Sequence, residues 1–385
     1  MNTRAEAVRT YVLRILLTFI AALAITLTLS WTILAQAGYY GTSSEPRYSD
    51  RWIPRAETLM NGGALYNDVP TTTPPLINFL LVPPVFVSGL FEHRNPWSTM
   101  SFQIYFSLFN LLTAYILFFG STDRKVGYKA ALYFLLNPLT LGNSVLRRQD
   151  EAVLVFFWAV SLLLTIRRKH WAAGVVYGLS LLIKVSGLLM IPIAFFRTLD
   201  WRYLVLPLVV FAAVATPFLS ASGSAASLLD VRQPELGHPF QLDGVSLGAL
   251  WSRMRDTSGQ PMLPAYSGIL VIATLVVAVW IMHRPHGLIE DLLLLTATVL
   301  ALAPKLHTGY LALLVLLMTP LLLQQHELIA PYFILGSLGL VADLLKFPYE
   351  RFTAAFVTMA ACLFNLAVVA VYVRLHPSGI SGKPA

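Results

Sequence analysis

The chain has 385 residues, of which 57% are hydrophobic and 12% charged, with a formal net charge of +8. Soluble domains carry about 25% charged residues, so this composition indicates a protein solvated mainly by lipid and argues against a second, soluble domain. Lys and Arg lie mostly in short loops between apolar segments, as the positive-inside rule describes, so the net charge does not indicate nucleic-acid binding. The single cysteine, Cys362, lies in an apolar segment, which excludes a disulfide framework and a cysteine metal site.

The apolar segments have about the length of ~20 residues that crosses a hydrocarbon core. The first, at 15–35, is too long for a cleavable signal peptide and lacks a small-x-small site, so we expect a retained anchor. Arg4, Arg9 and Arg14 precede it and place the N-terminus in the cytoplasm. We predict about twelve spans with both ends inside: 13–36, 98–119, 128–146, 151–166, 170–184, 186–197, 203–220, 266–283, 288–304, 309–324, 328–346 and 352–374.

The apolar segment 75–91 is interpreted as non-spanning. It is about long enough to cross the bilayer, but it contains Pro75, Pro83 and Pro84. If it spanned, the basic loops at 123–129 and 167–170 would both lie outside, against the positive-inside rule. A re-entrant or interfacial segment returns both loops to the cytoplasm.

A long polar loop, 37–97, then follows the first span on the outside, and its 49–76 part is rich in turns and carboxylates. Ser49 or Asp50 is suited to cap a short helix, whose first turn tolerates Pro54. Gly62 and Gly63 are expected to end that helix. A second long external loop is predicted at 221–265 and a cytoplasmic tail at 376–385.

The predicted topology brings several ionisable groups to the outer face, where Lys184 and Lys305 are exceptions to the positive-inside rule. Charges at membrane depth are costly and therefore often functional. Group transfer from a lipid phosphate carrier to a hydroxyl needs a carboxylate to take the proton and cations to hold the leaving phosphate. The external loop supplies carboxylates, and Arg147, Arg148, Lys184 and Lys305 supply cations. No soluble nucleotide-binding fold is apparent, so a lipid-borne donor is expected.

Four blocks of this sequence resemble polyprenyl-phosphate-sugar-dependent glycosyltransferases of the GT-C fold, in particular glycosyltransferase family 87, an alpha-mannosyltransferase-like group. The first is the run Asp50…Gly62…Tyr66-Asn67-Asp68…Thr73-Pro74-Pro75-Leu76, which is similar to the family's first external loop. The others follow in order: Asn143-Ser144 with Gln149-Asp150-Glu151-Ala152; Gly178-Leu179-Ser180-Leu181-Leu182-Ile183-Lys184 with Pro192; and Lys305-Leu306-His307-Thr308-Gly309-Tyr310.

The resemblance implies an all-α polytopic membrane protein, a GT-C-like bundle of about 12 transmembrane helices with a helical first external loop, in one domain over 1–385. It also implies that Asp50 is the general base and that the anomeric centre is inverted. The expected substrate-binding residues are Glu57, Arg147, Arg148, Asp150, Lys184, Lys305, His307 and Tyr310. No Asp-x-Asp pair occurs in the external loops, so neither a metal nor another cofactor is expected.

Most of these residues also have a structural interpretation, whereas Lys184 and Lys305 are harder to explain in that way because both depart from the positive-inside rule. Asp50 is a natural N-cap, Glu57 is typical of a solvated helix face, and Arg147 and Arg148 are suited to snorkel at the interface. Asp150 either caps the helix that begins at Glu151 or pairs with those arginines. Asp68, in Tyr-Asn-Asp, is typical of a turn residue. His307 can be explained as a hydrogen-bonded histidine at the membrane interface.

The main functional prediction is an integral, multi-pass cell-membrane glycosyltransferase for glycolipid biosynthesis in the cell envelope. It would move a sugar, with mannose expected, from a polyprenyl- or dolichyl-phosphate carrier to a lipid-linked or glycolipid acceptor on the non-cytoplasmic side. The alternatives are a transporter or lipid flippase, and a non-catalytic assembly subunit. Transporters often have broken helices in matching halves, and the broken segment 75–91 has no such counterpart, which favours the enzyme.

Overall fold

The structure, a computed structural model, describes residues 2–36, 48–69, 71, 73–92, 95–220, 264–283, 287–302, 308–345 and 352–376. Within these ranges the chain consists of helices and turns, with one isolated bridge between Leu65 and Val69 and no β-strand. The all-α fold class is therefore confirmed. Most of the expected loop 221–265 and of the tail 376–385 lies outside the described residues.

The chain divides into two compact units. One comprises Met1–Leu136, Thr140–Leu188 and Arg202–Leu229, and the other Asn137–Leu139, Leu189–Trp201 and Asp230–Ala385. The first unit holds α1 (Asn2–Gln36), α2 (Tyr48–Met60), α3 (Pro75–Leu80), α4 (Val82–Ser88), α5 (Pro96–Gly120), α6 (Arg124–Leu136), most of α7 (Pro138–Val145), α8 (Glu151–Ile166), α9 (His170–Leu181) and α11 (Arg202–Ser220). The second holds α10 (Met190–Thr198), α14 (Pro264–Met282), α15 (Leu288–Leu302), η2 (Thr308–Tyr310), α16 (Leu311–Leu321), η3 (His326–Leu328), α17 (Ile329–Leu344) and α18 (Phe352–Leu375).

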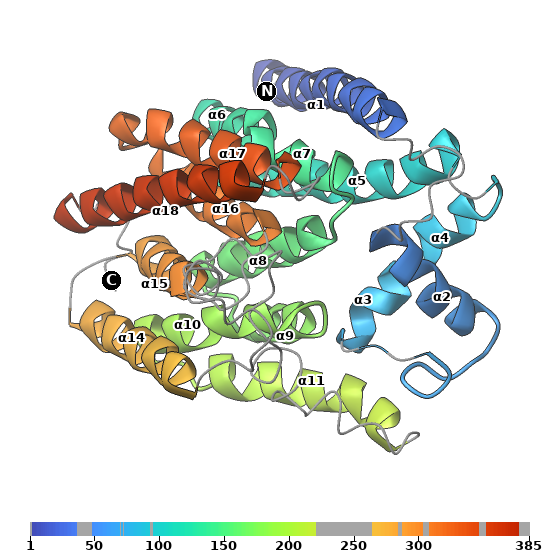
Figure 1. Cartoon of the computed structure of the whole chain (residues 1–385). Helices are drawn as coiled ribbons and strands as arrows, with labels where there is room; N and C mark the ends of the chain where they lie inside the picture. The colour runs from blue at the N-terminus through green and yellow to red at the C-terminus, as the bar shows by residue number, and fades with distance from the viewer. Residues whose placement is uncertain are drawn as a thin grey trace. The chain divides into compact units, whose positions relative to one another are not determined.

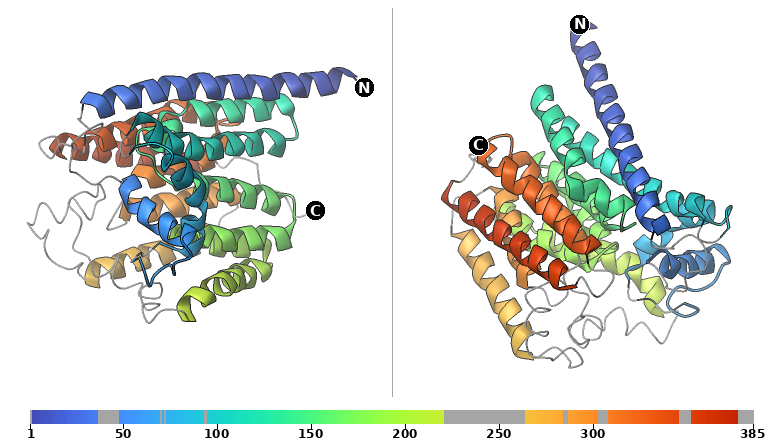
Figure 2. Two further views of the ribbon diagram at one scale, coloured as in Figure 1. Left: turned by 90° about the vertical axis from the view of Figure 1, so that its right-hand side faces the viewer. Right: turned by 45° about the horizontal axis from the view of Figure 1, so that its top comes forward.

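Helix α5 lies at the centre of the first unit. It packs against α1, α4, α6 and α8, and α9 then connects α8 to α11 by packing against both (Figure 1). The long helix α1 runs along α5 and α6 (Figure 2). Buried aromatic side chains fill the interior, among them Phe102, Phe106, Phe118 and Trp158. These helices form the frame that carries α2, α3 and α4 of the external loop.

Three helices in the described part of the chain are long and apolar enough to cross a membrane: Ala5–Gln36, Pro96–Gly120 and Thr353–Leu375. The other predicted spans correspond to shorter apolar helices, so the chain is an all-α membrane protein but the count of twelve is not confirmed. The segment 75–91 contains α3 and α4, of 6 and 7 residues. At about 1.5 Å per residue, these two helices together are shorter than a ~30 Å hydrocarbon core.

The predicted span 128–146 is divided between two helices, because α6 stops at Leu136 and α7 starts at Pro138. Proline has no backbone N–H and cannot continue the hydrogen-bond ladder. Asn137 occupies the break, where its Oδ1 accepts a hydrogen bond from Leu139 N at 3.0 Å and its Nδ2 donates to Tyr332 O at 3.1 Å. The side chain of Asn137 therefore caps the second helix.

Helices α9 and α11 approach closely because Gly174 and Gly178 present no side chain. A Cβ added at Gly178 would lie 2.6 Å from Val210 Cβ, and one added at Gly174 would lie 3.0 Å from Arg202 O. Glycines four residues apart allow two membrane helices to come into backbone contact.

We expect Gly178→Ala to lower the free energy of unfolding by about 1–3 kcal/mol, the usual cost of overpacking. Thermal unfolding of the purified protein in detergent measures this. Gly89→Ala is the matched control, because a Cβ there meets its nearest atoms at 3.5 Å, an ordinary contact. Equal melting temperatures for the two variants would contradict the packing argument.

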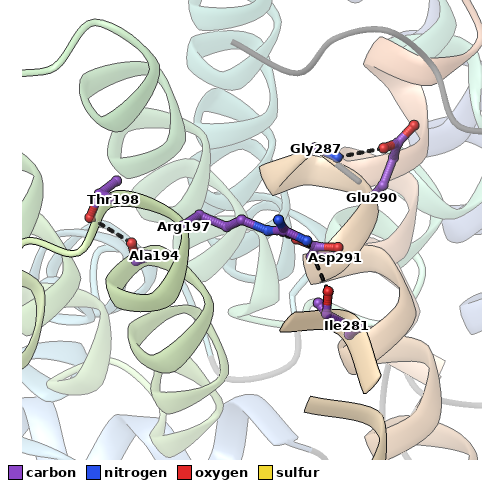
Figure 3. A network of polar contacts seen from close by, with 7 residues as sticks. All are labelled: Ala194, Arg197, Thr198, Ile281, Gly287, Glu290 and Asp291. Carbon is purple, nitrogen blue, oxygen red and sulfur yellow. Dashed lines mark hydrogen bonds and ion pairs between the residues drawn. The ribbon is translucent and has the colours of Figure 1, made fainter. Parts of the chain in front are cut away.

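In the second unit, α10 is tied to α15 and to the end of α14 by one arginine. Arg197 forms an ion pair with Asp291, which is fully buried, and its Nη2 donates to Ile281 O at 3.0 Å (Figure 3). The neighbouring Glu290 accepts a hydrogen bond from Gly287 N at 2.6 Å. A cavity of about 230 Å³ is lined by the ion pair and by Ile193, Phe196, Leu199 and Ile281.

Candidate functional site

The short helix predicted in the external loop is confirmed as α2, and it ends at the predicted glycine pair. Helix α2 ends at Met60, Gly62 adopts φ +74°, and Gly63 N donates to Thr58 O at 2.8 Å while Gly62 N donates to Leu59 O at 3.2 Å. This pattern is a Schellman motif, which glycine enters without steric cost. Asp68 then holds the next turn, because its Oδ2 accepts from Ala64 N at 2.7 Å. The turn interpretation of Asp68 is therefore confirmed.

Helix α2 begins at Tyr48, so Ser49 and Asp50 lie inside it and Pro54 lies in its interior, not in the first turn as predicted. Because proline lacks an N–H, Pro54 cannot donate to the carbonyl of Asp50 four residues earlier. The backbone of Asp50 is thus placed in the first turn of α2, while its side chain lies outside what the structure describes.

A polar network fixes α2 to the segment that enters α3. Arg55 Nη1 donates to Thr73 Oγ1 at 3.1 Å, and Thr73 Oγ1 donates to Asn78 Oδ1 at 3.2 Å. Tyr66 OH donates to Thr73 O at 2.6 Å, and burial raises the pKa of Tyr66, which keeps the phenol protonated as a donor. Thr73 therefore joins three parts of the loop.

The start of α3 docks on the turn that follows α9. Ile77 N donates to Leu182 O at 3.4 Å, and the rings of Tyr66 and Phe79 both pack on Phe218 of α11, with centroids 5.9 and 6.0 Å away. The loop that carries Asp50 is thus attached, within one compact unit, to the turn that carries Lys184.

Lys184 lies beside two carboxylates at the start of α8. Its Nζ is 2.8 Å from Asp150 Oδ1 and also forms an ion pair with Glu151. Glu151 is 1% exposed and Asp150 6%. Asp150 occupies the N-cap position of α8, but its side chain makes no capping hydrogen bond. The predicted capping role is therefore not observed, and the carboxylate of Asp150 instead forms an ion pair with Lys184.

The turn between α7 and α8 carries both predicted arginines. Arg148 is 3% exposed and adopts φ 54°, a left-handed conformation. Asn110 Nδ2 donates to Thr140 O at 3.0 Å, and Gln103 Nε2 donates to Val145 O at 2.8 Å, so α5 holds the end of α7 in place. Non-glycine residues in this conformation cost about 1–3 kcal/mol and occur often at functional sites.

Two substitutions separate the backbone of Arg148 from its side chain. Both Arg148→Gly and Arg148→Ala remove the guanidinium, but only glycine adopts φ 54° without strain. We expect the glycine variant to be the more stable by about 1 kcal/mol, as measured by thermal unfolding of both proteins. An alanine variant equal to or more stable than the glycine variant would show that the turn relaxes.

The remaining predicted site residues are placed as follows. Glu57 is exposed on α2, and Tyr310 is half-buried at the end of η2 in the second unit. Lys305 and His307 lie outside the described residues. The structure thus brings together Asp150 and Lys184 with Glu151, and places Arg147 and Arg148 in the turn just before them.

Two residues outside the predicted set make contacts at the candidate site. Glu151 pairs with Lys184, and Arg55 donates to Thr73 in the external loop. Glu151 is a second carboxylate directly after Asp150 at the start of an apolar helix, a signal that the sequence contains. Arg55 offers no such signal, because its contact with Thr73 depends on how the loop folds. Among the described residues, no group of three His, Cys, Asp or Glu side chains is arranged to hold a metal ion.

Comparison with known protein families identifies the class of enzyme to which the chain belongs. The model of glycosyltransferase family 87 matches residues 72–315, more than half of the 385-residue chain. The protein is therefore a glycosyltransferase with membrane helices. It belongs to glycosyltransferase family 87, as its sequence motifs predict. A search of curated proteins gave no match.

The matched region includes three of the four motif blocks and the Thr73–Leu76 end of the first. The part of the first block from Asp50 to Asp68 precedes it. The cluster of Asp150, Glu151 and Lys184 lies inside the matched region, whereas the expected general base does not.

Proposed function

We propose that this protein transfers a sugar, with mannose expected, from a polyprenyl- or dolichyl-phosphate carrier to a lipid-linked or glycolipid acceptor on the non-cytoplasmic side of the membrane. The observation that carries the proposal is the family match over 72–315 in a chain of apolar helices. A donor embedded in the bilayer suits such a chain, because a lipid carrier reaches the site from the membrane.

The proposed reaction is a single displacement at the anomeric carbon. The acceptor hydroxyl oxygen forms a bond to that carbon while the bond from the carbon to the phosphate oxygen breaks, and the configuration inverts. The hydroxyl proton passes to the carboxylate of Asp50, the proposed general base. The electron pair of the broken bond leaves with the polyprenyl phosphate. Arg147 and Arg148 are proposed to stabilise the charge that develops on this phosphate.

Lys305, His307 and Tyr310 are proposed as further substrate contacts, and Glu57 as a contact at the edge of the site. Lys184 and Asp150 belong to the same proposed substrate-binding set. The active side is assigned from the charge of the loops, since Arg4, Arg9 and Arg14 place the N-terminus inside and the loop that follows α1 outside. No metal or cofactor is required by this mechanism.

Purified protein in lipid nanodiscs tests the proposal. Polyprenyl-phosphate mannose and GDP-mannose, each radiolabelled, are compared as donors with a panel of glycolipid acceptors, with and without EDTA. We expect label in a lipid product only with the lipid donor, and equal rates in EDTA. Transfer from the nucleotide sugar, or lipid translocation without any product, would overturn the proposal and favour another donor class or a flippase.

A further inference from the structure

The backbone of Lys184 is hydrogen-bonded on both sides. Its N–H donates to Ser180 O at 3.0 Å, and its carbonyl accepts from Gly187 N at 3.0 Å. A Cβ added at Gly187 would lie 2.7 Å from Ser180 Oγ, so the turn is also tightly packed. With the backbone fixed, the position of the ammonium depends on the groups that bind it.

Glu151 is the deeper of the two carboxylates that bind this ammonium. Its side chain is 2% exposed, compared with 8% for Asp150 and 17% for Lys184. Its Oε2 is buried and has no hydrogen-bond partner in the described ranges. A buried carboxylate is costly unless it is paired, and the ion pair with Lys184 is the partner that the structure gives to Glu151.

The charges of this cluster indicate what Lys184 can bind. Two carboxylates pair with one ammonium, so the charge of Lys184 is already balanced by Asp150 and Glu151 when all three groups are ionised. A phosphate placed against Lys184 would be repelled by Asp150 and Glu151 at close range. A sugar hydroxyl is uncharged and both donates and accepts hydrogen bonds, so it fits an ammonium flanked by carboxylates.

We propose that Glu151 is a positioning residue that holds Lys184 for contact with a hydroxyl of the sugar, and that the phosphate is bound elsewhere. This inference rests on the proposed function, and it narrows the predicted role of Lys184 from a general cation to a sugar contact. Glu151 itself touches no substrate in this arrangement.

The first test needs no turnover. Amine acylation followed by peptide mass spectrometry measures the labelling rate of Lys184, with the exposed Lys125 and Lys129 as internal references. We expect Glu151→Gln to raise the rate at Lys184 several-fold and to leave the references unchanged, because the ammonium loses an ionic partner. An unchanged rate at Lys184 would overturn the positioning role even if the protein proved to have no transferase activity.

The second test is a double-mutant cycle in the transfer assay. We expect Glu151→Gln to lower kcat/KM by roughly 10- to 100-fold, the range of one charge-assisted hydrogen bond, and to have no further effect in a Lys184→Met background. An equal loss in both backgrounds would show that Glu151 acts independently. Glu290→Gln is the matched control, another 1%-exposed glutamate in the first turn of an apolar helix.

The third test separates the sugar from the phosphate. Polyprenyl phosphate without a sugar is used as a competitive inhibitor of the wild type and of Lys184→Met. We expect the variant to bind this inhibitor as tightly as the wild type while its KM for the sugar donor rises about tenfold or more. Weaker inhibition by polyprenyl phosphate in the variant would mean that Lys184 binds the phosphate, and the inference would be wrong. Absence of transfer by the wild type would instead count against the proposed function.

Discussion

Asp50→Asn is expected to lower the rate of sugar transfer by roughly 10²–10⁴-fold, the usual contribution of general acid–base catalysis. The amide is nearly isosteric with the carboxylate but cannot accept the hydroxyl proton. Asp50 lies in the first turn of α2. The end of this helix is fixed by the Gly62 turn, and its middle by the contact of Arg55 with Thr73 at 3.1 Å. The loss should therefore appear in turnover while the melting temperature stays close to that of the wild type.

The matched control for this experiment is Glu92→Gln. Glu92 is an exposed carboxylate of the same external loop, and the mechanism assigns it no role, so its removal should leave the rate unchanged. Single-turnover rates with lipid donor, measured together with thermal unfolding, distinguish a lost base from a damaged fold. Full activity in Asp50→Asn would eliminate Asp50 as the base.

The helices were largely predictable because lipid solvation gives each an apolar run of recognisable length. The interruption at Asn137 was not, although Pro138 marks it, because a proline in a membrane segment is compatible with a kink as well as with a break. What decides the outcome is the side chain of Asn137, which caps one helix and reaches Tyr332 O. A contact of that kind, far apart in the chain, cannot be derived from hydropathy.

In the candidate site, too, a residue could be predicted from the sequence but its long-range contacts could not. The position of Lys184 against the positive-inside rule made it a candidate site residue from the sequence alone. Its partners were not predictable, because Glu151 lies 33 residues earlier and an ammonium at a helix end is equally compatible with a phosphate, a lipid headgroup or a carboxylate. Arg55 was missed for a related reason, since nothing local distinguishes it from Arg51 on the same helix.

The largest effect on stability is expected at the Arg197–Asp291 ion pair of the second unit (Figure 3). Arg197→Met leaves the carboxylate of Asp291, whose side chain is 0% exposed, without its guanidinium. Removal of one partner of a buried pair costs about 3–5 kcal/mol, because an uncompensated charge stays buried. Arg197 Nη2 also donates to Ile281 O at 3.0 Å, so the variant loses the link to α14 as well. Unfolding in SDS titrations measures this loss.

The double variant Arg197→Met/Asp291→Leu separates the two contributions. With both charges gone, the desolvation cost disappears, and replacing a buried pair by apolar residues is often neutral or stabilising. The cavity of about 230 Å³ beside the pair gives the new side chains room to adjust. We therefore expect the double variant to recover most of the stability that Arg197→Met loses. A double variant as unstable as the single one would mean that the hydrogen bond to Ile281, rather than the buried charge, ties α10 to its neighbours.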